Sequence, residues 1–142
     1  MKTTNLALAV VLLVSAIVSG YILPTDNYLF TVALTHWYVL TAFAVIDLAL
    51  VIGLWRRPGT AIIGAIILGV AELTAMVADI FFGTLTFFPS PTPAVFTRYL
   101  LGYAPFDTLL VVQVVLIVVG YAAFVMWERT SSVAGNPSVD MV

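Results

Sequence analysis

The chain has 142 residues, of which 63% are hydrophobic and only 8% are charged. A water-soluble domain carries about 25% charged residues, so this composition excludes an ordinary soluble globule and indicates an integral membrane protein. The few charges sum to −2 without any basic run, which excludes nucleic acid as an expected partner. Cysteine is absent, which excludes disulfides, thiolate metal sites and thiol redox chemistry.

Four apolar segments are each long enough to cross a hydrocarbon core, which takes about 20 helical residues. In chain order they cover approximately residues 5–23, 28–55, 60–82 and 106–127. Turn-forming residues separate them, namely Pro24 to Asn27, Arg56 to Gly59, and a proline-rich segment over residues 87–105. We therefore predict an all-α transmembrane four-helix bundle over residues 1–128, followed by a short polar tail over residues 129–142.

Two smaller features accompany these spans. The stretch over residues 96–101, in the long segment between the third and fourth spans, predicts a short interfacial helix on the membrane surface. The first span has some character of a secretory signal peptide, since Lys2 precedes an apolar run that ends in small residues. Only one basic residue precedes the run, so we expect this span to be retained.

The basic residues predict the direction of the spans, because Lys and Arg favour cytoplasmic loops. With four spans, Lys2, the Arg56–Arg57 pair and Arg129 all fall on one side, and only Arg98 falls on the other. We therefore expect a multi-pass protein of the cell membrane with both termini in the cytoplasm.

Ionisable residues lie inside two of the predicted spans: His36 and Asp47 in the second, Glu72 and Asp79 in the third. Each charged group at mid-membrane costs about 2.5–3.5 kcal/mol on insertion scales, so such residues face protein or a wet cavity. The spacings of eleven and seven residues place each pair on one helical face. Gln113 in the fourth span is expected to make an interhelical hydrogen bond.

Depth along the helices suggests which of these groups meet. His36 and Asp79 lie in the outer part of the membrane and are candidates for a histidine–carboxylate pair. Asp47 and Glu72 lie deeper, and if they approach each other they share a proton, since two adjacent carboxylates are costly to ionise together. The alternatives are a proton or cation path and simple hydrogen bonding between helices. A metal site of His36, Glu72 and Asp79 is a further alternative, with few ligands to support it.

No catalytic motif or phosphate-binding loop is present, so we expect no catalytic residue, cofactor or metal ion in this chain alone. Almost all of its mass is membrane-embedded. The leading hypothesis is therefore an accessory subunit that packs, amid lipid, against other integral membrane subunits of a larger complex, such as a respiratory oxidase or a membrane monooxygenase. The alternative is a small homo-oligomeric proton-coupled transporter or channel that uses the intramembrane carboxylates.

Overall fold

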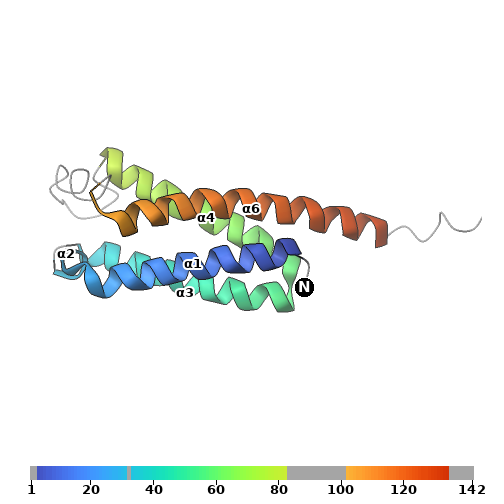
Figure 1. Ribbon diagram of the computed structural model, residues 1–142, viewed down its shortest axis with the longest axis horizontal. Helices are drawn as coiled ribbons and strands as arrows, with labels where there is room; N and C mark the ends of the chain where they lie inside the picture. The colour runs from blue at the N-terminus through green and yellow to red at the C-terminus, as the bar shows by residue number, and fades with distance from the viewer. Residues whose placement is uncertain (1–2, 32, 83–101, 135–142) are drawn as a thin grey trace, which may run out of the picture.

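The structure is a computed structural model that describes residues 3–31, 33–82 and 102–134 (Figure 1). These residues form only helices and short connections. The helices are α1 (Thr3–Thr25), α2 (Asn27–Thr31), α3 (Leu34–Arg56), α4 (Pro58–Phe82) and α6 (Ala104–Ala134). All but α2 are long and apolar enough to cross a membrane. The chain is therefore a multi-pass membrane protein, and the predicted all-α four-helix bundle is confirmed.

The four long helices form a ring in which each packs against its neighbours in the chain, and α6 closes the ring against α1. Figure 1 shows α1 beside α3 and α4 beside α6, in two layers. One end of the bundle holds the start of α1, the turn between α3 and α4, and the far part of α6; we call it the Arg56 end. The opposite end holds α2 and the start of α6, and we call it the α2 end.

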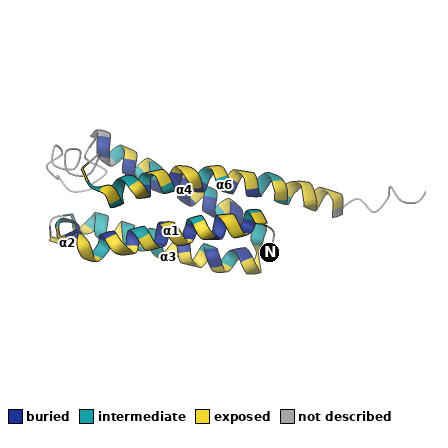
Figure 2. Cartoon of the chain, in the orientation of Figure 1, coloured by how far each residue is buried: buried dark blue, intermediate teal, exposed yellow. Residues whose placement is uncertain are grey.

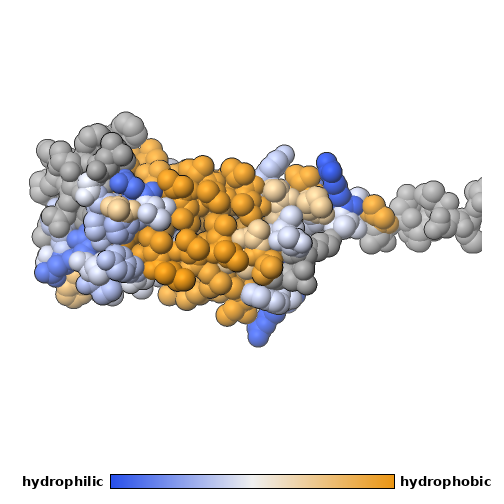
Figure 3. Space-filling view, in the orientation of Figure 1, coloured by the Kyte–Doolittle hydropathy of each residue, from blue (hydrophilic) through white to orange (hydrophobic). Residues whose placement is uncertain are grey.

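The outer surface of the ring is apolar over its middle. Large side chains such as Ile17, Val45, Ile67 and Val118 are 60% or more exposed, although they lie in the centre of their helices. Figure 2 shows exposed residues along the outward faces of the long helices, and Figure 3 shows a hydrophobic band between two more polar ends. Such a band is the surface that lipid chains cover.

A purely apolar core fills the bundle toward the Arg56 end. Leu8 and Leu12 of α1 meet Ile62 of α4 and Leu116 of α6, and all four side chains are fully buried. Val51 and Leu54 of α3, together with small residues of α1, α4 and α6, complete this apolar cluster. These side chains form an apolar layer across the bundle on the side of the Arg56 end.

The predicted second span is wrong in one respect, because it is not one continuous helix. The chain breaks near Ala33, so that α2 lies across the end of the bundle and α3 begins at Leu34. Leu29 of α2 is buried against Ile22, Met76 and Leu109. The short helix therefore covers the α2 end.

The helix that contains the fourth span is longer than the predicted span. The helix α6 begins at Ala104 and continues to Ala134, so part of the expected tail is helical. Residues 135–142 of that tail, and the interfacial helix expected over residues 96–101, lie outside the described residues.

Candidate functional site

Four fully buried polar residues, one from each long helix, meet in the middle of the bundle. We call Ser15, Asp47, Glu72 and Gln113 the polar cluster; none is more than 1% exposed. Ser15, Asp47 and Glu72 lie about halfway along their helices, and Gln113 lies about a third of the way along α6. These polar side chains therefore lie in the interior of the bundle, at the level of the membrane core, where little water is present.

One hydrogen bond within the cluster links two helices. The Gln113 side-chain amide donates to the Ser15 hydroxyl over 2.9 Å. The interhelical hydrogen bond predicted for Gln113 is therefore present, and it fixes α6 against α1. The Ser15 hydroxyl also lies near the Asp47 carboxyl of α3.

The two acids of the cluster lie close together. Asp47 of α3 and Glu72 of α4 are near enough for their charges to act on each other. Among the described residues, none makes a hydrogen bond of standard geometry to any carboxylate oxygen of Asp47 or Glu72. Buried polar atoms in folded proteins nearly always have partners, and an unpaired ionised carboxylate in an apolar interior costs several kcal/mol or more. The site therefore requires protons, water or a ligand.

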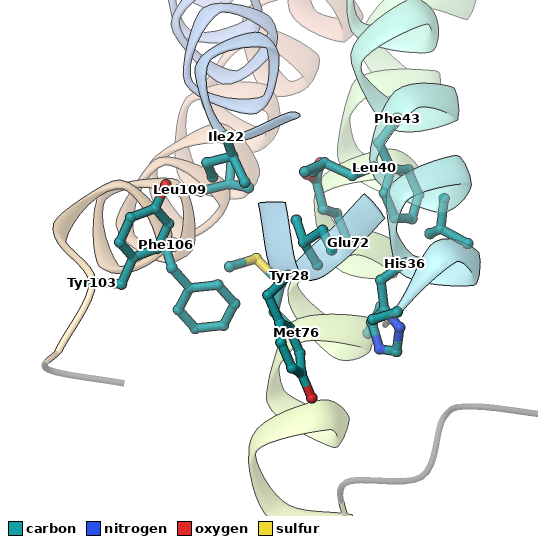
Figure 4. A pocket seen from close by; sticks show the side chains of 14 residues that line it. Ile22, Tyr28, His36, Leu40, Phe43, Glu72, Met76, Tyr103, Phe106 and Leu109 are labelled. Atoms are coloured by element: carbon teal, nitrogen blue, oxygen red, sulfur yellow. The ribbon is translucent and has the colours of Figure 1, made fainter. Parts of the chain in front are cut away.

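A pocket reaches Glu72 from the α2 end. Its volume is about 110 Å³, and Glu72 is the only acid among the described residues that line it. Figure 4 shows Glu72 and Met76 projecting from α4, with Leu40, Phe43 and His36 on the α3 side. These positions follow helical spacing, since residues three, four and seven apart share a face. The same face of α3 continues from the pocket to Asp47.

The short helix α2 and the start of α6 shape the entrance to the pocket. The Asp26 carboxylate accepts a hydrogen bond of 3.1 Å from the backbone amide of Tyr28, as an N-terminal helix cap does. Tyr28 then lines the pocket from α2, and Tyr103 and Phe106 line it from the other side. The Tyr103 hydroxyl lies 3.3 Å from the Thr25 hydroxyl, which ties this side to α1.

The structure brings together most of the residues singled out from the sequence. Asp47, Glu72 and Gln113 are in the polar cluster, and His36 lines the pocket that leads to it. His36 and Asp47 lie on one face of α3, as their spacing predicts. The side chain of Asp79 lies outside the described residues, so its pairing with His36 stays a prediction.

Sequence reasoning missed the contribution of α1 and of the pocket lining. Ser15 carries little signal, because serine is common at helix contacts in membranes. Tyr28 and Tyr103 lie near span ends, where tyrosine ordinarily marks the membrane boundary. In the described part of the chain, no group of three or more His, Cys, Asp or Glu side chains is placed to hold a metal ion.

In comparisons with known proteins, no family model matches this chain, and neither a curated protein nor a solved structure is significantly similar to it.

Proposed function

We propose that this protein is a small proton-coupled membrane carrier in which Glu72 and Asp47 hold the transported proton. The observation that carries the proposal is the pair of buried acids at the closed end of a pocket that leads in from one end of the bundle. Intramembrane acids of this kind are typical of proton relays in transporters. A pair of carboxylates in a low dielectric binds one proton between them more readily than it ionises twice.

The apolar cluster at the Arg56 end favours a carrier over an open channel. A proton that reaches Glu72 from the α2 end meets Leu12, Ile62 and Leu116 before the opposite end. Passage therefore needs a change in helix packing that exposes the acids to the second side. A four-span bundle is small for enclosing such a passage by itself, so we expect the working unit to contain more than one copy.

We further propose that the protein resides in the cell membrane with the Arg56 end in the cytoplasm. Arg56, Arg57 and Arg129 are all exposed at this end, which agrees with the preference of basic residues for the cytoplasmic side. In this orientation both termini are cytoplasmic and the pocket opens outward.

The test is proton flux into liposomes that contain the purified protein. An entrapped pH dye follows the flux driven by a pH gradient, with the membrane potential clamped. We expect the native protein to carry protons above the level of empty liposomes, and Glu72→Gln to lower the flux to that level. The matched control Glu128→Gln removes an exposed acid of α6 and should leave the flux unchanged.

Thiol labelling in intact cells tests the orientation. The chain has no cysteine, so a single Ser131→Cys substitution reports on the Arg56 end alone. In intact cells an impermeant thiol reagent should not label it. Labelling from outside would contradict the orientation, and native flux equal to that of empty liposomes would contradict the carrier.

The second candidate function is an accessory subunit of a larger membrane complex, of the oxidase or monooxygenase type considered above. It is favoured by the far part of α6, which continues past the turn between α3 and α4 and leaves Val133 80% exposed. A partner subunit would cover this projecting helix. The native mass of the detergent-extracted protein separates the two functions, because the carrier predicts copies of one chain and the subunit predicts other chains in fixed ratio.

A further inference from the structure

The pocket at the α2 end combines three features that together define a class of ligand. It has the volume for a small molecule, an apolar and aromatic wall, and a single acid at its inner end. Its volume of about 110 Å³ is smaller than that of an engineered protein cavity of about 150 Å³ that binds benzene. A ligand with one ring is therefore at the upper limit of its size.

The wall of the pocket favours a cation among such ligands. Four aromatic rings line it, those of Tyr28, Phe43, Tyr103 and Phe106. Aromatic faces attract ammonium groups, and several rings around one pocket are a common way to bind organic cations. The remaining lining is mostly aliphatic and suits the apolar body of a ligand.

The charges at the inner end of the pocket also favour a cationic ligand. Glu72 lines the pocket, and Asp47 lies behind it in the polar cluster. Apart from His36, no basic residue of the described part of the chain lines the pocket; Arg56, Arg57 and Arg129 are exposed at the opposite end of the bundle. The carboxylate oxygens of Glu72 are buried at the inner end of the pocket and have no hydrogen-bond partner among the described residues. They become acceptors for an ammonium donor when the side chain turns toward the pocket.

From these features we infer that the pocket binds a small apolar amine in its ammonium form, with the ammonium group on the Glu72 carboxylate and the ring among the aromatic side chains. The inference deepens the proposed function and rests on Glu72 being its working acid. In the carrier it makes the amine a second cation that Glu72 carries in place of the proton. When the ammonium ion binds, the carboxyl group gives its proton to water at the α2 end, so the net charge of the site stays the same.

The test is calorimetric titration of the detergent-purified protein with benzylamine and, separately, with benzyl alcohol. The two probes have nearly the same shape, but only the first forms an ammonium ion. We expect benzylamine to bind about tenfold or more tightly than benzyl alcohol, a factor that corresponds to about 1.4 kcal/mol. Glu72→Gln should remove this preference, and Glu128→Gln should keep it.

If Glu72→Gln does not fold, a second variant tests whether the probes bind in the pocket. Met76→Phe places a larger side chain in the pocket without touching an acid, and it should weaken the binding of both probes. Equal affinity for the two probes in the native protein, no binding of benzylamine, or an unchanged preference in Glu72→Gln would overturn the inference. If benzylamine bound but the protein carried no protons, only the proposed carrier function would be refuted. If the protein carried protons but did not bind benzylamine, only the inferred amine site would be refuted.

Discussion

Glu72 occupies a position where an apolar side chain would pack more favourably. It is 1% exposed, and its neighbours on α4 include the buried Leu68 and Met76. Replacing a buried ion pair by apolar residues of similar volume is often neutral or stabilising, by up to about 4 kcal/mol. The Glu72 oxygens have no hydrogen-bond partner among the described residues, so replacing Glu72 removes a desolvation cost without breaking a hydrogen bond. A lower stability than an apolar replacement would give is the property expected of a residue that is kept for function.

The first prediction is that Glu72→Met raises the free energy of unfolding by about 1 kcal/mol or more, because it removes a buried polar group without hydrogen-bond partners. Denaturation of the detergent-solubilised protein, followed by circular dichroism, measures the change. The control Leu68→Met alters only an apolar side chain and should change stability by less than about 1.5 kcal/mol. If Glu72→Met instead lowered stability by more than the control, the carboxyl group would have a structural role.

Sequence alone identified the polar residues that are buried in the spans better than it predicted their contacts. Asp47 and Glu72 stand out because acids are rare in apolar helices. Their depths suggested that they meet, whereas the role of Ser15 as the acceptor for Gln113 had no signal in the sequence. A polar residue in a span indicates that a partner is needed, but the sequence does not identify that partner.

At the scale of helices, glycines permit the close packing of α4 against its neighbours. A Cβ atom added at Gly120 of α6 would lie 2.8 Å from Ile66 of α4, and one at Gly69 of α4 would lie 3.1 Å from Ile117 of α6. At Gly59, near the start of α4, an added Cβ atom would overlap the ring of Trp127. In contrast, nothing lies within 4 Å of the corresponding position at Gly20.

This contrast gives the second prediction. Gly59→Ala should lower the free energy of unfolding by about 1–3 kcal/mol, because the ring of Trp127 has to move and the contact between α4 and α6 is strained. Gly20→Ala should raise it by about 0.5–1 kcal/mol, because alanine favours a helix more than glycine does. The two variants are compared by the same denaturation measurement. An equal effect of both would mean that α4 and α6 do not pack as closely as in the structure.

Hydropathy predicted the four long helices. It did not predict helix ends that differ from the ends of the apolar segments. The breaks around Pro24 and Pro58 carry residues that mark turns, but no proline or glycine marks the break near Ala33. In the same way, α6 leaves the apolar zone after Trp127 and stays helical to Ala134. Polarity marks the end of a span and says little about the end of a helix.

At the scale of the whole molecule, the order of the four long helices around the ring brings one polar residue from each helix into a single site. Because α1 lies between α3 and α6, Ser15 approaches Asp47 on one side and Gln113 on the other. The pocket depends on α2 crossing the end of the bundle, together with side chains from α3, α4 and α6. Helical periodicity gives the inward face of each helix but not the order of helices around the ring, so neither the cluster nor the pocket was predicted as a unit.

The central claim is that Glu72 is a proton-bearing acid that a small apolar molecule reaches through the pocket. Diisopropylcarbodiimide tests this claim most directly, because it combines with protonated carboxyl groups in apolar surroundings. The carboxyl proton passes to a nitrogen of the reagent while the carboxylate oxygen bonds to its central carbon, and the adduct rearranges to a stable acylurea. Peptide mass spectrometry then locates the modified residue.

We predict that the folded protein in detergent is modified at Glu72, which lines the pocket, in clear preference to Asp47 behind it. The exposed Glu128 should stay unmodified, because it does not lie in apolar surroundings. Benzylamine in the pocket should slow the modification of Glu72. A folded protein that reacts at other carboxyl groups while Glu72 stays intact would contradict the claim.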